Sequence, residues 1–294
     1  MPFSGVDDIF SNISNGNSFF TIWNKAINPV QVAGRWSDTF TMQGIPESGS
    51  YPGAIGSFTL MDDTTPGALY TGGRKDPLSK HLLSLEAISG TATGAGATLM
   101  LVDLLMYYIV DPRITTVQTM SGSSGNALPL RSGVQHTGAG VYMFLEGLNT
   151  MAASSPYLTI SYTNHLGASP RTVQGNPAVS ASTTITQIAH SGLGAANYGP
   201  FLPLDNGDGG IISVQSVKFS SAGTAGVQAA LILCEPLAMV PIGAIDSASI
   251  RDFVFSRTTL PRIRGGACLA FLLNNSQATV AATQLSCFVN VAWG

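Results

Sequence analysis

An internal repeat is the feature that most restricts the fold of this chain. The segment Leu101–Leu105 (LVDLL) matches Leu233–Leu237 (LCEPL) and aligns Asp103 with Glu235 at a spacing of 132 residues. Four more pairs of segments match in the same order: Leu83–Ile88 with Ile212–Val217, Leu128–Pro129 with Leu260–Pro261, Gly140–Leu145 with Gly266–Leu272, and Leu158–Tyr162 with Val289–Trp293. A repeated order indicates homologous structural units. We predict two modules, residues 51–165 and 185–294, joined by a linker at 166–184 and preceded by an N-terminal segment at 1–50.

Both modules carry the patterns of β-strands. Residues Leu158–Tyr162 and Phe288–Trp293 alternate large apolar with small polar side chains, which is the period of a half-buried strand. Met143–Leu145 and Leu269–Leu273 are short apolar runs, typical of strands buried on both faces. Leu78–Ile88 has the spacing of a short helix, but its repeat partner alternates, so a strand is predicted there. The sequence therefore predicts an all-β fold of two tandem antiparallel β-sandwich or jelly-roll-like modules.

The composition excludes several other classes of protein. Only 10% of the residues are charged, too few to line the solvent-facing sides of many helices, and 45% are hydrophobic, too many for a disordered chain. A net charge of −3 does not suit a protein that neutralises nucleic-acid phosphates. The longest apolar run, Ala97–Val110, contains Asp103 and is too short to cross a membrane. Met1–Asp8 lacks the features of a secretion signal, so synthesis in the cytoplasm is expected.

The N-terminal segment 1–50 lies outside the repeat and combines a polar lead, Ser11–Asn17, with an aromatic cluster, Phe19–Trp23. Such a cluster must be buried, either on the first module or on another subunit. We favour an arm that docks on a neighbouring subunit. The residues predicted to make assembly contacts are Phe19, Phe20, Trp23, Arg35 and Trp36.

The sequence contains no motif of a catalytic, cofactor or metal site. The four histidines share no metal-binding spacing, and no serine-hydrolase elbow or phosphate loop is present. His136 and His165 stand among turn residues, and we expect both to be exposed. Cys234, Cys268 and Cys287 lack C-x-x-C spacing, so they are predicted to be small buried side chains, in preference to a Cys268–Cys287 disulfide.

Asp103 and Glu235 are the best carboxylate candidates, because each interrupts an apolar strand at an equivalent position. Acid–base catalysis would need both to face one cleft. Repeat-equivalent residues are expected in separate modules, so a structural role is favoured, with an arginine such as Arg113 or Arg262 as partner. The turn at 205–208 lacks the distal glutamate of a calcium loop and is predicted to be only a turn.

Several segments resemble a group of tailed-bacteriophage virion proteins. They are Gly34–Trp36, Leu101–Tyr108, Gln118–Met120, Gly199–Leu204 and Gly207–Ile211, and the resemblance covers most of residues 34–294. The resemblance implies a structural protein of the particle with no enzymatic activity and no cofactor.

Among virion roles we favour a capsid decoration (cement) protein on the exterior of the head. Its partners would be copies of itself, as a trimer or dimer, and the phage major capsid protein, with no nucleic acid, membrane or small-molecule substrate. Three alternatives stay open: a double jelly-roll major capsid protein, a tail or neck component, and a carbohydrate-binding module or glycosidase. The last would stack sugars on exposed aromatic residues such as Tyr107, Tyr108 and Tyr198.

Overall fold

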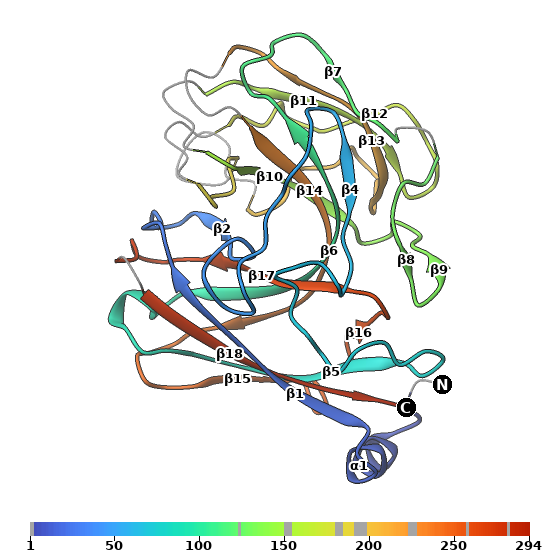
Figure 1. The fold of residues 1–294 in the computed structure, drawn as a ribbon, viewed down its shortest axis with the longest axis vertical. Helices are drawn as coiled ribbons and strands as arrows, with labels where there is room; N and C mark the ends of the chain where they lie inside the picture. Colours follow the sequence, from blue (N-terminus) through green and yellow to red (C-terminus); the bar gives the residue numbers. More distant parts are fainter. Residues whose placement is uncertain are drawn as a thin grey trace.

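The computed structural model describes residues 3–122, 125–149, 155–179, 185–190, 199–222, 228–256, 259–280 and 283–294 (Figure 1). Nearly all regular structure in these residues is antiparallel β, so the all-β sandwich fold predicted from the sequence is confirmed. Three sheets, named A, B and C below, form the body of the protein. Sheet B is central, and sheets A and C pack on different parts of it (Figure 1).

Sheet B contains the two longest strands. Its order is β10 (Tyr142–Gly147), β14 (Ala229–Pro241), β6 (Thr98–Val110), β17 (Cys268–Asn274) and β2 (Trp36–Asp38), and β4 (Phe58–Leu60) pairs with β6. The segment Ile185–His190 connects both edges of this sheet. Asp38 N donates to Thr186 O at 2.8 Å, and Gly147 N donates to Gln187 O at 3.2 Å. Sheet B is therefore closed into a barrel by a segment that is not itself a regular strand.

Sheet A incorporates the N-terminal segment. Its order is β15 (Ser249–Asp252), β5 (Lys80–Ser89), β18 (Thr283–Trp293), β1 (Ser18–Ile27) and β3 (Gly44–Ile45), with β16 (Arg262–Ile263) also on β5. All ten residues of β1 pair with β18, and the Trp23 side chain is buried against Phe271. The favoured interpretation, an arm docked on a neighbouring subunit, is therefore wrong for β1. The aromatic cluster completes a sheet of its own chain, because β18 offers an unpaired edge.

Sheet C is smaller, and the remaining elements are short. Its order is β12 (Arg171–Thr172), β11 (Leu158–Asn164), β13 (Ile211–Phe219) and β7 (Gln118–Thr119). A hairpin of β8 (Leu130–Arg131) and β9 (Val134–Gln135) and the 3₁₀ turn η1 (Ala92–Gly94) complete the described elements, apart from α1.

The helix α1 (Val6–Ser14) was not predicted from the sequence. Its residues Val6, Ile9 and Ile13 recur at helical spacing, and Asp7 and Asp8 stand favourably in the first turn. Nine residues give too short a pattern to stand out from a polar lead. The helix forms because Ile9 packs against Leu83 and Ala292 at one end of sheet A.

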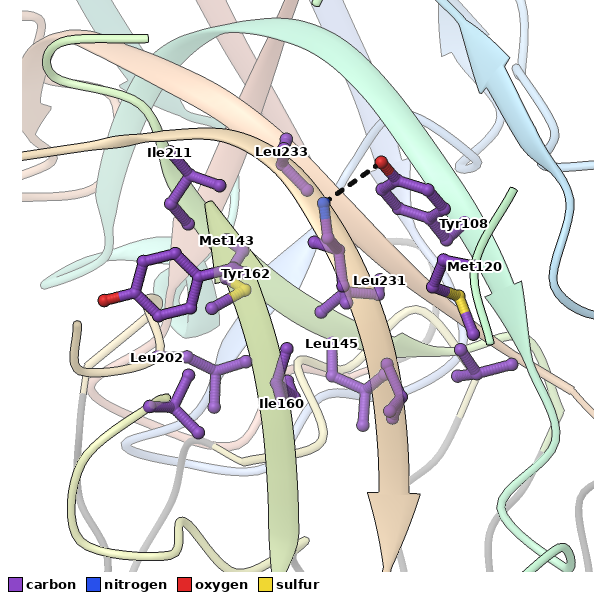
Figure 2. Packing of buried hydrophobic residues seen from close by; sticks show 14 of the residues in the cluster. Tyr108, Met120, Met143, Leu145, Ile160, Tyr162, Leu202, Ile211, Leu231 and Leu233 are labelled. Carbon is purple, nitrogen blue, oxygen red and sulfur yellow. Dashed lines mark hydrogen bonds between the residues drawn. The ribbon is translucent and has the colours of Figure 1, made fainter. Parts of the chain in front are cut away.

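Three apolar clusters fill the spaces defined by the sheets. Along β6, Leu101 faces sheet A, Val102 points into the barrel, and Tyr108 faces sheet C. Figure 2 shows the cluster between sheets B and C, where Val214 N donates to the Tyr108 hydroxyl at 3.3 Å. A single long strand thus contributes to all three clusters. Its successive side chains point to opposite faces, and its two ends lie against different sheets.

The two copies of the repeat are interleaved strand by strand. Five pairings join one copy to the other: β6 with β14, β6 with β17, β10 with β14, β5 with β18, and β11 with β13. The layer of sheet A and the layer of sheet C therefore both combine strands of residues 51–165 with strands of residues 185–294.

Candidate functional site

Asp103 and Glu235 lie directly across from each other on β6 and β14. This arrangement corrects the expectation that repeat-equivalent residues lie apart, and the reason is the pairing of the two repeat copies along these strands. Asp103 forms two hydrogen bonds of 2.8 Å with Arg131 and accepts a third from Cys268 N at 2.9 Å. Arg131 also donates to the carbonyl of Leu104 at 3.1 Å.

The ion pair of Asp103 and Arg131 is buried, and its two hydrogen bonds are those of a pair that stabilises the fold. Both side chains are almost inaccessible to solvent. Burial raises the pKa of Asp103, while the hydrogen bonds from Arg131 act in the opposite direction. The structural role predicted for Asp103 is thus supported, but its partner is Arg131. Arg113 instead pairs with Asp111, and Arg262 lies on β16.

Glu235 makes a second set of polar contacts. Its Oε2 lies 3.0 Å from His136 Nε2 and 3.6 Å from Arg264 Nε. Gly138 N donates to His136 Nδ1, so Nε2 carries the proton that is donated to Glu235. His136 is fully buried, and the prediction that it is exposed is wrong, because its ring bridges β14 and the turn before β10.

The residues that were considered for calcium binding or for a disulfide are buried or make hydrogen bonds within the fold. The side chain of Asp208 accepts hydrogen bonds from Tyr162, Asn164 and Arg171, which anchors the turn that was compared with a calcium loop. Among the described residues, no group of three or more His, Cys, Asp or Glu side chains is placed to hold a metal ion. No described helix has the length and hydropathy needed to cross a membrane. The three cysteines are buried and unpaired, as predicted.

The tyrosines proposed for sugar stacking are not available for it. Tyr107 points into the barrel, where its hydroxyl donates to Pro52 O at 2.6 Å, and Tyr108 lies in the cluster under sheet C. Both are buried. Tyr198 lies outside the described residues. The expectation that Tyr107 and Tyr108 are exposed is therefore wrong, because β6 is covered on both faces.

The five predicted assembly residues do not form one patch. Trp23 is in the core, and Phe19, on the same face of β1, packs edge-on against Tyr70. Phe20 points the opposite way, is 53% exposed and stacks on Phe288. Arg35 and Trp36 lie at the barrel edge, where Arg35 Nη1 donates to Gln187 Oε1 at 3.3 Å. An assembly role for Phe19, Phe20, Arg35 and Trp36 stays a prediction, and Trp23 has no surface to contribute.

The outer face of sheet A carries several exposed apolar side chains. Ile22, Phe288, Glu86 and Ile250 stand in one row across β1, β18, β5 and β15. Ile22 is 42% exposed and Ile250 is 67% exposed. Phe20 lies in the next row of this face, and apart from the end under α1 no described element covers these rows. Contiguous exposed apolar surface of this kind marks interaction sites.

A second candidate, a buried pair of acidic side chains, was not found by sequence reasoning. Asp38 on β2 and Glu146 on β10 both point into the barrel, next to the segment that closes it. Tyr51 donates to Asp38 Oδ2 at 2.5 Å and Phe40 N donates to Oδ1 at 2.8 Å. Burial raises the pKa of Asp38, and burial together with the Asp38 charge raises that of Glu146 well above its usual value. The two acids come from sequence positions more than one hundred residues apart, so only the closure of sheet B brings them together.

Comparisons with known proteins place this chain in no family. No protein-family model matches it, and no curated protein gives a significant match. The structural comparison returns VP2 of infectious bursal disease virus. A subviral particle of VP2 aligns with a TM-score of 0.17 and 10% identity over 94% of this chain and 79% of that chain. A chain in the structure of the Gt strain of infectious bursal disease virus aligns with a TM-score of 0.19 and 13% identity over 94% of this chain and 80% of that chain. Likenesses at these TM-scores do not establish a shared fold, so function is argued below from the chain itself.

Proposed function

We propose that this chain is a non-enzymatic structural protein of a virus particle and that it decorates the exterior of a tailed-phage head as a cement protein. The observation that carries the proposal is the outer face of sheet A. Its apolar rows are joined by neutral polar pairs, such as Asn24 with Ser286 and Asn290 with Ser84. The carboxylates on this face are Glu86 on β5 and Asp252 on the edge strand β15. Interfaces between proteins have such charge-depleted centres.

The proposal of a non-enzymatic role is supported by the way the charged groups are used. Asp103 and Arg131 satisfy each other, Glu235 is held by His136 and Arg264, and Asp208 is held by Arg171. Groups paired in this way stabilise strands and turns and are not poised for proton transfer. The slightly acidic net charge also favours the outer shell over a surface that lines packaged nucleic acid.

The decisive experiment measures where the chain sits in an intact particle and how many copies are present, by cryo-electron microscopy and gel densitometry. Decoration predicts copies spread over the head and saturable rebinding of purified, soluble trimers or dimers to stripped heads. Formation of closed shells by this chain alone would replace decoration with a coat-protein role. Copies confined to one vertex would indicate a tail or neck component.

A further inference from the structure

A groove of about 550 Å³ lies beside the second half of β14. On one side of this strand, β6 pairs with it as far as Pro241, whereas on the other side β10 pairs with it only as far as Cys234. Among the described residues, no strand pairs with that second side between Leu237 and Pro241. Sheet B therefore has a short free edge, and the groove follows it.

The hydrogen bonds at the end of β14 show which backbone groups point toward the groove. Ile242 N donates to Ala97 O at 2.7 Å, so the backbone groups of Ile242 point to the β6 side. Backbone groups of an antiparallel strand point alternately to its two sides, so those of Pro241 and Met239 point away from β6. Outside the pairing with β6, no hydrogen bond of the described residues uses these groups. The groove thus receives the N–H and carbonyl of Met239 and the carbonyl of Pro241.

The side chains that line the groove are mainly apolar. Met239 lies directly opposite Met100 in the β14–β6 pairing, so the two side chains are neighbours on one face of the sheet. Met239 is 49% exposed, and Pro236 and Leu237 extend the apolar wall. Methionine side chains are flexible and polarisable, so such a wall adapts to apolar side chains of different shapes.

Arg251 on β15 gives the groove a positive charge. Its side chain is exposed and lines the groove. No carboxylate of the described residues forms an ion pair with Arg251, and its chain neighbour Asp252 instead accepts hydrogen bonds from Val254 N and Phe255 N. A guanidinium group binds a carboxylate through two parallel hydrogen bonds. The groove therefore combines free backbone groups, an apolar wall and a site for an acidic side chain.

We propose that this groove receives an extended segment of a different protein chain of the particle. The segment adds as a short strand to the free edge of β14 and places an acidic side chain against Arg251. Its alternate apolar side chains lie on Met239 and Met100. The source of the segment rests on the proposed function, whereas the strand addition and the preference for an acidic residue do not.

Prolines and charge limit what can bind at this edge. Pro236 and Pro241 lack N–H groups, so the run of donors between them is short and cannot continue into a long sheet. Two copies of this chain joined through the same edge would bring two Arg251 side chains to one side of the joined sheet, where like charges repel. Charge complementarity therefore favours an acidic segment of a different chain over a second copy.

The first test selects ligands for the purified full chain from a library of capped six-residue peptides of random sequence. The native chain should enrich peptides with Asp or Glu among apolar residues, and Arg251→Glu should enrich peptides with Lys or Arg instead. The control Arg262→Gln changes another exposed arginine of sheet A, outside the groove, and should select the same peptides as the native chain. The proposal is overturned if no peptide is enriched or if Arg251→Glu and the native chain select the same peptides.

The second test asks whether an enriched peptide binds as a strand. The peptide is made in two further forms, each with N-methyl groups on alternate residues, so that together the two forms cover both sides of the strand. Because only alternate N–H groups of a strand point to its neighbour, one form should bind about tenfold more weakly and the other should bind as the parent peptide does. Equal affinities of the two forms, whether retained or lost, would overturn strand addition.

The third test identifies the source of the segment by placing a photo-reactive benzophenone side chain at Met239 of the full chain and rebinding it to stripped heads. We expect cross-links to a different protein chain, in a peptide that contains Asp or Glu, and about tenfold fewer cross-links when Arg251→Glu is added. Cross-links only between copies of this chain, or none, would overturn a source in a different chain of the particle. Absence of the chain from particles would contradict the proposed function while leaving the peptide results in force.

Discussion

Sheets A and C use equivalent strands of the two repeat copies, yet their outer faces differ in chemistry. In sheet A the row through β1, β18, β5 and β15 reads Ile22, Phe288, Glu86 and Ile250. In sheet C the corresponding surface carries neutral hydroxyl side chains and one lysine: Thr119, Thr159, Ser161, Thr172, Ser216 and Lys218. Equivalent strands of the repeat pair in both sheets. The outward-facing residues decide whether the outer face of a sheet is hydrophilic, as in sheet C, or apolar enough to contact another protein, as in sheet A.

Part of this difference comes from β1, which has ten residues, whereas β12 at the equivalent edge of sheet C has two. β1 contributes Phe20 and Ile22 to the outer face of sheet A and Trp23 and Ile27 to the core beneath it. An added strand therefore serves stability and surface at once, through alternate residues.

The largest expected effect is on the buried face of β1. Trp23→Ala should lower the free energy of unfolding by about 3–5 kcal/mol, because it removes a large core side chain that packs on Phe271. Phe20→Ala, on the opposite face, should change it by less than about 1 kcal/mol. Urea unfolding of the two variants measures the contrast. Equal effects would show that sheet A does not separate a core face from an interaction face.

The next effect compares the two equivalent carboxylates. Asp103→Asn should cost about 3–5 kcal/mol, because it leaves the Arg131 guanidinium buried without a full counter-charge. Glu235→Gln should cost about 1 kcal/mol, since this side chain is 20% exposed. Thermal unfolding of both variants would test the ranking, and a larger loss for Glu235→Gln would reverse the assignment of the central ion pair.

A smaller effect on stability, but a clear one on attachment, is expected at the outer faces. Ile22→Ser combined with Ile250→Ser should weaken rebinding to stripped heads about tenfold, because it removes apolar contact area at the proposed interface. Thr159→Ala combined with Lys218→Ala in sheet C serves as the matched control and should rebind as the native chain does. The comparison fails if the sheet C pair is the one that weakens rebinding.

The smallest effect concerns the pH dependence of stability. The pKa of Glu146 is raised in the folded state, so the folded chain binds more protons than the unfolded chain above the ordinary glutamate pKa. The stability that the raised pKa of Glu146 contributes is fully present at low pH, and it is lost as pH rises toward the folded-state pKa. Glu146→Gln should flatten this decline in denaturation midpoints measured from pH 4.5 to 8. An unchanged slope would place the proton elsewhere, on Asp38 for example.

Local patterns predicted much of the fold because they depend on neighbouring residues. The alternation in Leu158–Tyr162 and Phe288–Trp293 gave β11 and β18, and the apolar run at Leu269–Leu273 gave β17. Matched segments also identified equivalent strands before any pairing was known. The helix α1 was not predicted because nine residues form a weak pattern, and the helix is stabilised by packing of Ile9 against Leu83 and Ala292.

The sequence by itself determined the strands, the turns, the scarcity of charge and the repeat, since each is written in the order of side chains. Only the tertiary structure decided that Asp103 faces Glu235, that Trp23 enters the core of its own chain, and that Asp38 meets Glu146. These contacts depend on which strands pair although they are far apart in the sequence. That choice follows from the summed burial and hydrogen bonding of whole sheets, which no local pattern records.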